Sequence, residues 1–293
     1  MSASISGSVK IIVVTFFALV AFAANSILCR LALGEEKIDP ASFTAIRLAS
    51  GALVLLLLVI SQQPRTFSFW GSWQSSIMLF IYAVCFSFAY VSLDTATGAL
   101  ILFGTVQMTM LLFSYFKGVR LHRIEWSGVV LAFAGLVYLM LPGAQFPGWK
   151  GTVLMILSGI AWGFYSLWGR DSVQALKDTA FNFIRTLPFV VILALVFYSQ
   201  ATISIDGAIY AVLSGAIASG VGYAIWYVAL AELSTTQSAV VQLFVPVLAA
   251  LGGVIILDEA VTLRLLIAGT MILGGILFVV LGRYYLAQAK LKR

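Results

Sequence analysis

Charged residues divide the chain into long, mostly apolar stretches. Ten uncharged stretches of at least 17 residues occur among its 293 residues. An α-helix rises about 1.5 Å per residue, so about 20 apolar residues cross the roughly 30 Å hydrocarbon layer of a bilayer. The pattern therefore predicts ten transmembrane helices. The stretches are 11–29, 48–64, 66–93, 95–116, 126–149, 151–169, 186–205, 207–231, 233–257 and 265–282.

The composition supports a chain that is embedded in a membrane over most of its length. Hydrophobic residues make up 62% and charged residues only 10%, and the mean hydropathy is +1.07. A soluble domain carries about 25% charged residues because its surface must be hydrated. Strands of a membrane barrel would be about 10 residues long with alternating polarity, unlike these stretches. We therefore predict an all-α membrane protein, with residues 1–293 forming a single transmembrane domain.

The distribution of Lys and Arg predicts the orientation. Positively charged residues that flank membrane helices stay on the cytoplasmic side. With the N-terminus inside, the inner segments hold eleven Lys and Arg residues and the outer segments three, with Arg30 near the outer end of the first helix. We predict a multi-pass protein of the bacterial inner membrane with both termini in the cytoplasm. The net charge of +6 then reflects topology and gives no reason to expect nucleic-acid binding.

The first stretch also has features of a secretory signal peptide, because residues 21–23 (AFA) resemble a cleavage site. Its apolar character continues to Leu33, which is too long for a typical signal sequence. We therefore interpret it as a retained first helix. The two cysteines, Cys29 and Cys85, lie in separate stretches and are expected to be buried apolar residues rather than a disulfide.

Short motifs recur in the same order in the two halves of the chain. Residues 43–47 (FTAIR) resemble 181–185 (FNFIR), and 90–93 (YVSL) resemble 227–230 (YVAL). The shared order predicts two five-helix repeats, at about 10–141 and about 150–286. Because five is odd, the second repeat enters the membrane from the opposite side, which gives inverted repeats. In transporters, such repeats enclose a substrate site near the bilayer midplane.

The end of the second repeat carries a series of motifs. It reads Pro246-Val247, Gly252-Gly253, Leu257-Asp258-Glu259-Ala260-Val261-Thr262, Gly269 and Gly274-Gly275. The series resembles EamA-type carriers of the drug/metabolite transporter superfamily. Their repeats typically end with a Pro in the fourth helix, a Gly-Glu turn and a Gly-rich fifth helix. This chain departs from the pattern, with Asp258 at the Gly of that turn, and with Thr105 and Gly118 at the Pro and Glu positions of the first repeat.

The resemblance implies a carrier that exports a small molecule from the cytoplasm. The aromatic content of 13% also makes the chain similar to YddG-type aromatic amino acid exporters. The leading hypothesis is export of amino acids, aromatic or large and apolar, by alternating access. The alternative is a broader metabolite or drug exporter, with or without proton coupling. Whether the carrier is a monomer or a homodimer stays open.

Aromatic residues in three helices are the main candidates for a substrate-binding site. Trp162 and Tyr82 lie near mid-span, where the aromatic belts of a membrane interface have no role. A cavity wall made of such residues would stack on an aromatic or bulky apolar group, whereas the alternative is ordinary packing and interface anchoring. The set comprises Tyr82 and Tyr90 in the third helix, Trp162, Tyr165 and Trp168 in the sixth, and Trp226 and Tyr227 in the eighth.

Three uncharged polar residues complete the candidate substrate-binding set: Asn25, Gln107 and Gln242. Their side chains can bind the amino or carboxylate group of a substrate. The alternative is hydrogen bonding between helices, which contributes about 0.6 kcal/mol on average.

Two arginines and two backbone-altering residues are candidates for gating or for structure. A charge inside the membrane costs at least about 2.5 kcal/mol. Arg47 and Arg185 therefore either bind carboxylates and gate the path, or reach an interface or backbone carbonyls. Pro246 removes a helical donor and predicts a bend in the ninth helix. Gly220 predicts close packing or a hinge in the eighth.

The sequence argues against several other functions. The single histidine, His122, lies in a predicted loop and the spans hold no carboxylate pair, so neither an enzyme nor a metal site is predicted. No P-loop motif is present, which argues against ATP-driven transport, and no cofactor is expected. Because no Asp or Glu lies deep in a predicted span, uniport or exchange is favoured over proton coupling.

Overall fold

The computed structural model describes residues 2–62, 71–118, 122–141, 148–169, 172, 174–233 and 241–291, of which 2–10, 124, 140, 227, 230, 231 and 283–291 are described by their backbone alone. The regular elements in these ranges are helices, with one isolated bridge between Ile38 and Ile203. The helices of the first half are α1 (Ser2–Leu33), α2 (Pro40–Gln62), α3 (Trp73–Tyr90), α4 (Thr95–Phe116) and α5 (Arg123–Met140).

The second half begins with α6 (Trp149–Gly169), α7 (Ala175–Val196) and the short 3₁₀ turn η1 (Tyr198–Gln200). One continuous helical segment follows, made of α8 (Ile205–Val212), the π-helical η2 (Leu213–Val221) and α9 (Gly222–Glu232). The chain then forms α11 (Phe244–Leu257) and α12 (Leu263–Leu291).

The chain is an all-helical, multi-pass membrane protein. Eight of its described helical segments are long and apolar enough to cross a bilayer, and two further apolar helices, Glu125–Leu139 and Phe244–Leu257, are shorter. The first of these two is shorter than its uncharged stretch because the helix ends at Met140. Pro142 follows two residues later, and a proline disfavours helical conformation in the residue before it.

Gln242 lies next to an interruption in the helical structure. Val241 and Gln242 are helical, the helix is interrupted at Leu243, and α11 begins at Phe244. Pro246 is in the first turn of α11, where its missing N–H group breaks no hydrogen bond within that helix.

Capping residues fix where helices begin and end. Asp39 Oδ1 accepts hydrogen bonds from the N–H groups of Ala41 and Ser42, and Pro40 fills the first position of α2, which needs no donor. At the end of α11, Asp258 adopts a left-handed conformation with φ 53°. Asp is one of the few non-glycine residues that tolerate this region, so it can replace the Gly of the Gly-Glu turn.

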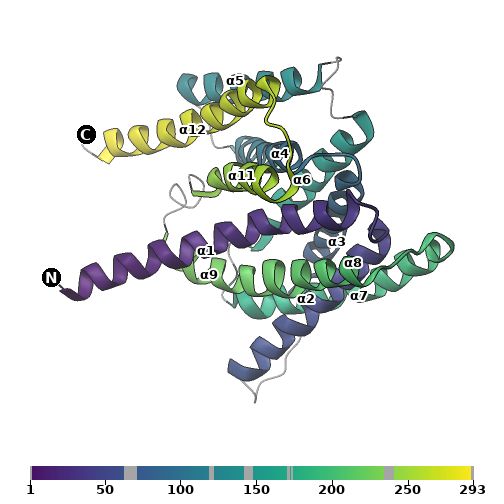
Figure 1. Ribbon diagram of the computed structural model, residues 1–293. Helices are drawn as coiled ribbons and strands as arrows, with labels where there is room; N and C mark the ends of the chain where they lie inside the picture. Colours follow the sequence, from purple (N-terminus) through teal and green to yellow (C-terminus); the bar gives the residue numbers. More distant parts are fainter. Residues whose placement is uncertain are drawn as a thin grey trace.

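The helices form layers in which elements from both halves lie next to one another (Figure 1). The two Gly-rich helices α5 and α12 pack along each other at one edge of the bundle. Gly128 and Gly275 face each other there, and a Cβ atom on either would collide with the backbone of the other. The start of α1 and the end of α12 lie on the same side of the bundle, which we name the termini side (Figure 1).

The helices α2 and α7 run antiparallel, and an aspartate secures each end of the pair. At one end, Asp39 Oδ2 accepts from the Thr202 N–H at 3.0 Å, in the loop after α7. At the other end, Asp178 Oδ1 accepts from the Gly71 N–H at 2.8 Å, in the loop after α2. Each aspartate thus stands near the start of one helix and binds the loop that follows the other.

The principal helix contacts come in exchangeable pairs. We match α1 to α5 with α6, α7, the α8–η2–α9 segment, α11 and α12, in that order. The contact of α3 with α6 then corresponds to that of α1 with α9, and the contact of α4 with α6 to that of α1 with α11. Likewise, α2 with η2 corresponds to α3 with α7. The two halves therefore pack against each other through equivalent helices.

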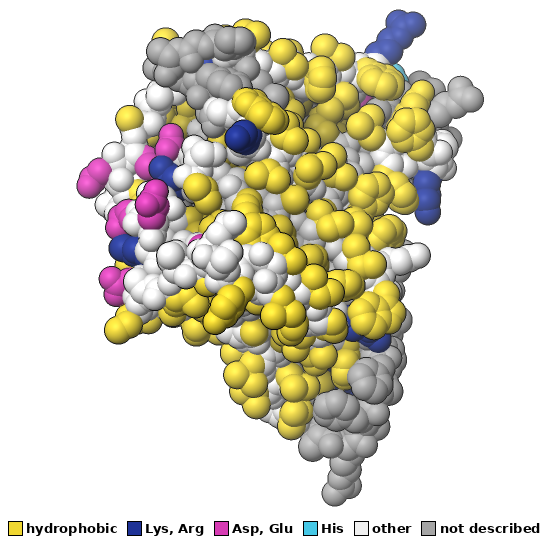
Figure 2. All heavy atoms as spheres, turned by 90° about the vertical axis from the view of Figure 1, so that its right-hand side faces the viewer, with side chains coloured by type: hydrophobic (Ala, Val, Ile, Leu, Met, Phe, Trp, Pro, Cys, Tyr) yellow, Lys and Arg dark blue, Asp and Glu magenta, His cyan; other side chains and the backbone are white. Residues whose placement is uncertain are grey.

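Apolar side chains cover much of the surface. Figure 2 shows the acidic side chains gathered at one edge of the face in view, Lys and Arg side chains at both edges, and apolar side chains over most of the area between them. Exposed apolar residues such as Leu53 and Leu57 on α2 and Ile192 and Leu195 on α7 lie on the outside of the bundle. Lipid would cover these side chains in a bilayer.

Candidate functional site

A small cavity lies between helices of both halves of the bundle. Its volume is about 20 Å³, which is enough for about one water molecule. Four separate helices and the helical segment that ends with α9 contribute to its wall, so neither half of the chain forms it alone. The lining residues are Phe22, Asn25 and Ser26 of α1, Tyr82 and Phe86 of α3, Leu102 and Phe103 of α4, Trp162 of α6 and Tyr223 of α9.

Trp162 is the hub of an aromatic cluster around this cavity. Its ring centroid lies 4.7 Å from that of Tyr82, 5.2 Å from that of Tyr223 and 5.3 Å from that of Tyr165. Tyr82 in turn packs against Phe86 at 5.4 Å. Rings at these separations attract one another beyond the effect of burial alone, and an inserted aromatic ring would find the same faces and edges.

Asn25 joins the cavity wall to the π-helical segment η2. Its Oδ1 accepts a hydrogen bond from Ser214 Oγ at 2.5 Å, and its Nδ2 donates to Ser219 Oγ at 3.2 Å. All three residues are buried. π-Helical turns often occur at functional sites because they displace side chains from regular helical spacing. Here the two serines, five residues apart on η2, both reach the same asparagine.

Arg47 lies directly behind the aromatic wall. It is only 1% exposed, and its Nη2 donates to Tyr82 Oη at 3.0 Å. The guanidinium carbon lies 5.3 Å from the ring centroid of Tyr82 and 4.8 Å from that of Phe86. Within the described residues, its Nη1 has no hydrogen-bond partner. One expected role of Arg47 was a hydrogen bond to backbone carbonyls. In the described residues, neither of its terminal nitrogens makes such a bond.

A charged cluster closes the bundle on the side opposite the termini. We name it the Arg30 cluster; it consists of Arg30, Asp94, Thr95 and Glu259. Arg30 lies 3.4 Å from both Asp94 and Glu259, measured between nitrogen and carboxylate oxygen. Glu259 also accepts from the Thr95 N–H at 2.9 Å and from its hydroxyl at 3.0 Å. The cluster therefore connects α1, the start of α4 and the link between α11 and α12.

Tyr90 lies between this cluster and the central cavity. Its carbonyl accepts from Arg30 Nη1 at 3.2 Å, and its hydroxyl donates to the Thr95 carbonyl at 3.3 Å. Its ring packs edge-on against Phe86, which lines the cavity, with centroids 4.8 Å apart. A continuous set of contacts thus runs from the cavity to the Arg30 cluster.

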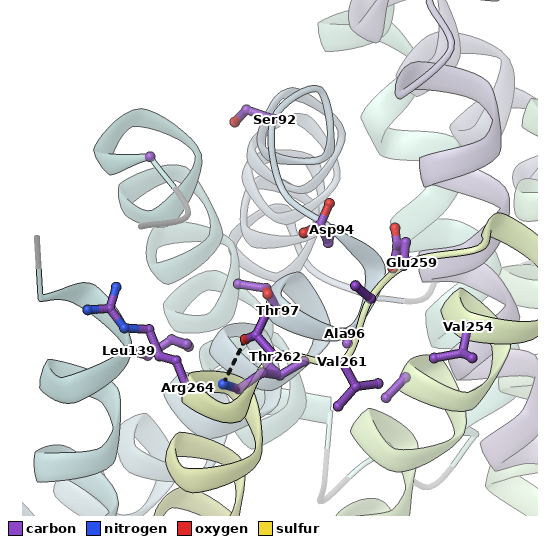
Figure 3. Close-up of a pocket in the computed structure, with 14 residues that line it drawn as sticks. Ser92, Asp94, Ala96, Thr97, Leu139, Val254, Glu259, Val261, Thr262 and Arg264 are labelled. Carbon is purple, nitrogen blue, oxygen red and sulfur yellow. Dashed lines mark hydrogen bonds between the residues drawn. The ribbon is translucent and has the colours of Figure 1, made fainter. Parts of the chain in front are cut away.

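A second, larger cavity of about 450 Å³ lies on the outside of the Arg30 cluster. Figure 3 shows Asp94 and Glu259 on one side of it and the Arg264 guanidinium on the other, with Thr97 and Thr262 between them. The dashed line marks the Leu265 N–H bonded to Thr262 Oγ1 at 3.1 Å, which caps α12. Charged side chains of both signs line this cavity, whereas the residues that line the central cavity are uncharged.

The structure brings several of the predicted substrate-binding residues together. Trp162, Tyr82 and Asn25 line the central cavity, and Tyr165 and Tyr90 pack against lining residues. Trp226 packs against Phe22 with ring centroids 5.6 Å apart. These six residues come from α1, α3, α6 and α9.

Other predicted residues lie elsewhere. Trp168 is 41% exposed and packs against Phe164, away from the central cavity. Gln107 is buried in α4 and Gln242 is half-buried ahead of α11, and neither lines the cavity. The side chain of Tyr227 lies outside the described part of the chain.

The candidates for gating or structure have distinct environments. Arg185 lies beside Trp73, with its guanidinium carbon 5.9 Å from the ring centroid, far along α7 from the cavity. Gly220 is in η2, where a Cβ atom would come 3.4 Å from the Gly215 carbonyl oxygen. Gly215 itself packs directly on the backbone of Arg47.

Two features of the site were not identified from the sequence. Phe22, Ser26, Leu102 and Phe103 line the cavity and had no signal in the sequence, whereas Tyr223 has the expected character of a mid-helix aromatic residue close to Trp226. The Arg30 cluster was the other omission. Its charged members were recognised as lying near helix ends, but no sequence spacing relates residue 30 to residue 259.

The described residues hold no metal-binding group: nowhere in them do three or more His, Cys, Asp or Glu side chains come together as potential ligands. Cys29 and Cys85 are free thiols in separate helices.

The protein is therefore a multi-pass helical membrane protein, and a cavity between its two halves is lined mainly by aromatic residues. The chain belongs to the EamA-like transporter family, which matches residues 9–141 and again 149–281. A family of transporters fits the expectation that the chain is not an enzyme.

Individual relatives agree with this assignment. The chain is 48% identical over 275 residues to an uncharacterized protein of Pseudomonas aeruginosa, covering 94% of this chain and 96% of that one. It is 24% identical over 217 residues to a probable amino-acid metabolite efflux pump of Escherichia coli, covering 69% and 72%. A solved crystal structure with 19% identity matches 90% of this chain and 96% of its own, with a TM-score of 0.61, which supports the fold.

Proposed function

We propose that this transporter exports amino acids with aromatic or large apolar side chains across the inner membrane by alternating access. The observation that carries the proposal is the central cavity, whose wall is formed by aromatic residues of both halves around Trp162. Ring faces and edges in a low-dielectric site favour an aromatic guest. The Escherichia coli relative, described as a probable amino-acid metabolite efflux pump, supports the substrate class.

The proposal includes ten transmembrane helices arranged as two inverted repeats. The exchangeable helix contacts support the repeats. The inversion is supported by Asp39 and Asp178, because equivalent contacts occur at opposite ends of the antiparallel pair α2 and α7. In an inverted repeat, one half can adopt the conformation of the other, which exposes the site first to one side and then to the other.

The size of the central cavity supports a carrier rather than an open channel. A volume of about 20 Å³ cannot hold an amino acid, so substrate enters only when the helices around the cavity separate. Phe86 lines the cavity and Tyr90 packs behind it under the Arg30 cluster. Opening toward the larger cavity of about 450 Å³ therefore requires the Arg30 cluster to break.

The charge distribution assigns sides to these features. With both termini in the cytoplasm, the Arg30 cluster lies at the periplasmic side and the larger cavity is the exit vestibule. The proposed transport is facilitative, either uniport or exchange. In support of this, none of the nine described residues that line the central cavity is acidic. The buried Glu125 lies at the start of α5 and accepts from the His122 N–H at 2.6 Å.

Transport in liposomes tests the proposal. The purified protein is reconstituted, and uptake of labelled phenylalanine is measured into vesicles preloaded with unlabelled phenylalanine, tryptophan, alanine or glycine. We expect aromatic amino acids to accelerate uptake several-fold over alanine and glycine, with no effect of an imposed pH gradient. Equal acceleration by all four would contradict the aromatic preference, and uptake that follows the pH gradient would contradict facilitative transport.

A further inference from the structure

We propose that Arg47 is the counter-charge for a carboxylate group of the transported molecule, so that the central site selects an anionic group next to an aromatic ring. The inference rests on the proposed function and specifies the chemistry of its substrate. Neither a decarboxylated amine nor a neutral amide of the same shape would satisfy this site.

Arg47 carries a buried charge that deprotonation cannot remove. Arginine cannot lose its proton in a protein, so Arg47 is a cation in all conformations. Its side chain is 1% exposed. Its Nη2 donates a hydrogen bond to Tyr82 Oη, and its Nη1 has no hydrogen-bond partner among the described residues. Buried charges are normally paired, because desolvation is otherwise uncompensated.

The groups that face the guanidinium of Arg47 are uncharged. From α3 these are the rings of Tyr82 and Phe86. From α1 and α9, Cys29 and Tyr223 lie near enough to interact electrostatically. None of these four carries a negative charge at neutral pH. No carboxylate in the described residues forms an ion pair with Arg47, so the positive charge is offered to a ligand.

Asp94 and Glu259, the acids of the Arg30 cluster, pair with a different arginine. Asp94 and Glu259 bind Arg30 on the far side of Tyr90. Glu259 additionally accepts from the backbone N–H of Thr95. Both carboxylates therefore have their partners within the Arg30 cluster, and no ion pair joins either of them to Arg47.

Arg47 lies close to the central cavity. Tyr82 and Phe86 stack against the guanidinium and also line the cavity, so a single layer of side chains separates the two. Trp162 packs on Tyr82 within the same wall. A bound aromatic ring at Trp162 would therefore leave its polar end next to Tyr82 and Arg47, where a planar guanidinium fits a carboxylate with two hydrogen bonds.

The matched position in the second repeat shows that this placement is specific to one half. Arg185 corresponds to Arg47 in the repeat, yet its guanidinium lies beside Trp73 and away from the cavity. Arg185 therefore serves as a natural control for Arg47.

Three probes of similar size test the inference: phenylacetate, its isosteric neutral amide phenylacetamide, and the cation phenethylamine. Binding to the purified protein in detergent is measured as a shift of the unfolding temperature. We expect phenylacetate to bind at least tenfold more tightly than either of the other two. Arg47→Gln should abolish this preference, Arg47→Lys should keep part of it, and Arg185→Gln should leave it unchanged. A single symmetrical peak in size-exclusion chromatography verifies that each variant is folded.

Should Arg47→Gln fail to fold, Tyr82→Phe provides the second measurement. It keeps the ring and the charge but removes the hydroxyl that holds Nη2, so the preference for phenylacetate should persist. A wild-type protein that binds all three probes equally, or none, overturns the inference, as does a preference that survives in Arg47→Gln.

The inference and the proposed function can fail separately. Liposome transport of phenylalanine that Arg47→Gln supports as well as the wild type would refute the role of Arg47 while leaving amino acid export intact. Carboxylate binding that depends on Arg47, without transport of any aromatic amino acid, would refute the proposed function and retain the inference.

Discussion

Arg30 of α1 and Glu259 of the α11–α12 link lie 3.4 Å apart between nitrogen and carboxylate oxygen, although 229 residues separate them in the sequence. The pair joins the first helix of the first repeat to the last loop of the second repeat. Glu259 is a member of the Leu257–Thr262 segment that resembles the family's Gly-Glu turn. The motif glutamate thus contacts α1 and the start of α4, and so links the two halves of the chain.

Glu259→Ala should destabilise this closed conformation. The change leaves the half-buried Arg30 and the Thr95 N–H without their acceptor, and each unsatisfied group costs about 1–3 kcal/mol. The unfolding temperature in detergent should fall by several degrees. Glu35→Ala is the matched control, because Glu35 pairs with Lys37 in an exposed position where ion pairs contribute little. Equal stability of the two variants would show that the Arg30 cluster does not hold the closed state.

Trp162→Ala should lower the transport of aromatic amino acids by about two- to tenfold, because one aromatic contact contributes about 0.5–1.5 kcal/mol. Exchange of phenylalanine in liposomes measures this effect. Trp168→Ala is the control, since Trp168 lies on the same helix but is exposed and distant from the cavity. A similar loss in both variants would argue against stacking on Trp162.

Gly215→Ala should destabilise the contact between η2 and α2. A Cβ atom at this position would overlap the Arg47 carbonyl oxygen and Ser50 Oγ, and such overpacking typically costs about 1–3 kcal/mol. Gly274→Ala provides the comparison, because a Cβ atom there meets no heavy atom within 4 Å. Thermal unfolding in detergent should show a clear loss for the first variant and none for the second.

The proposed inverted topology predicts that Thr202 and Gln74 face opposite sides of the membrane. Both are exposed, in the loop after α7 and in the first turn of α3 respectively. In a background without Cys29 and Cys85, a membrane-impermeant maleimide should label Thr202→Cys in intact cells and Gln74→Cys only after lysis. Labelling of both from the same side would disprove the inverted arrangement.

The aromatic candidates show how far sequence reasoning reached. Trp162 and Tyr82 were identified as mid-span aromatics, and the structure places their rings 4.7 Å apart. Trp168 continues the three-residue spacing of Trp162 and Tyr165 along α6. Its exposure depends on which neighbouring helix covers that part of α6. Periodicity identifies a helix face without specifying the partner helix, and several helices compete for that role in a bundle.

The sequence also could not distinguish the surroundings of the two arginines at matched positions of the repeats. Arg47 and Arg185 occupy matched motifs, and sequence offered equal readings for both. The structure buries Arg47 against Tyr82 and Phe86 and places Arg185 beside Trp73. The repeat is therefore conserved in its backbone packing but not in the chemistry of its side chains.

By itself, the sequence determined that this protein is a helical membrane protein with two similar halves, because the length and polarity of each segment decide its partition between lipid and water before any contact forms. The central cavity, the position of Arg47 behind it and the Arg30–Glu259 pair were decided only by the tertiary structure. They depend on close approach between helices distant in the chain, which is set by glycine contacts and hydrogen bonds such as those of Gly215 and Asn25 and has no counterpart in local sequence patterns.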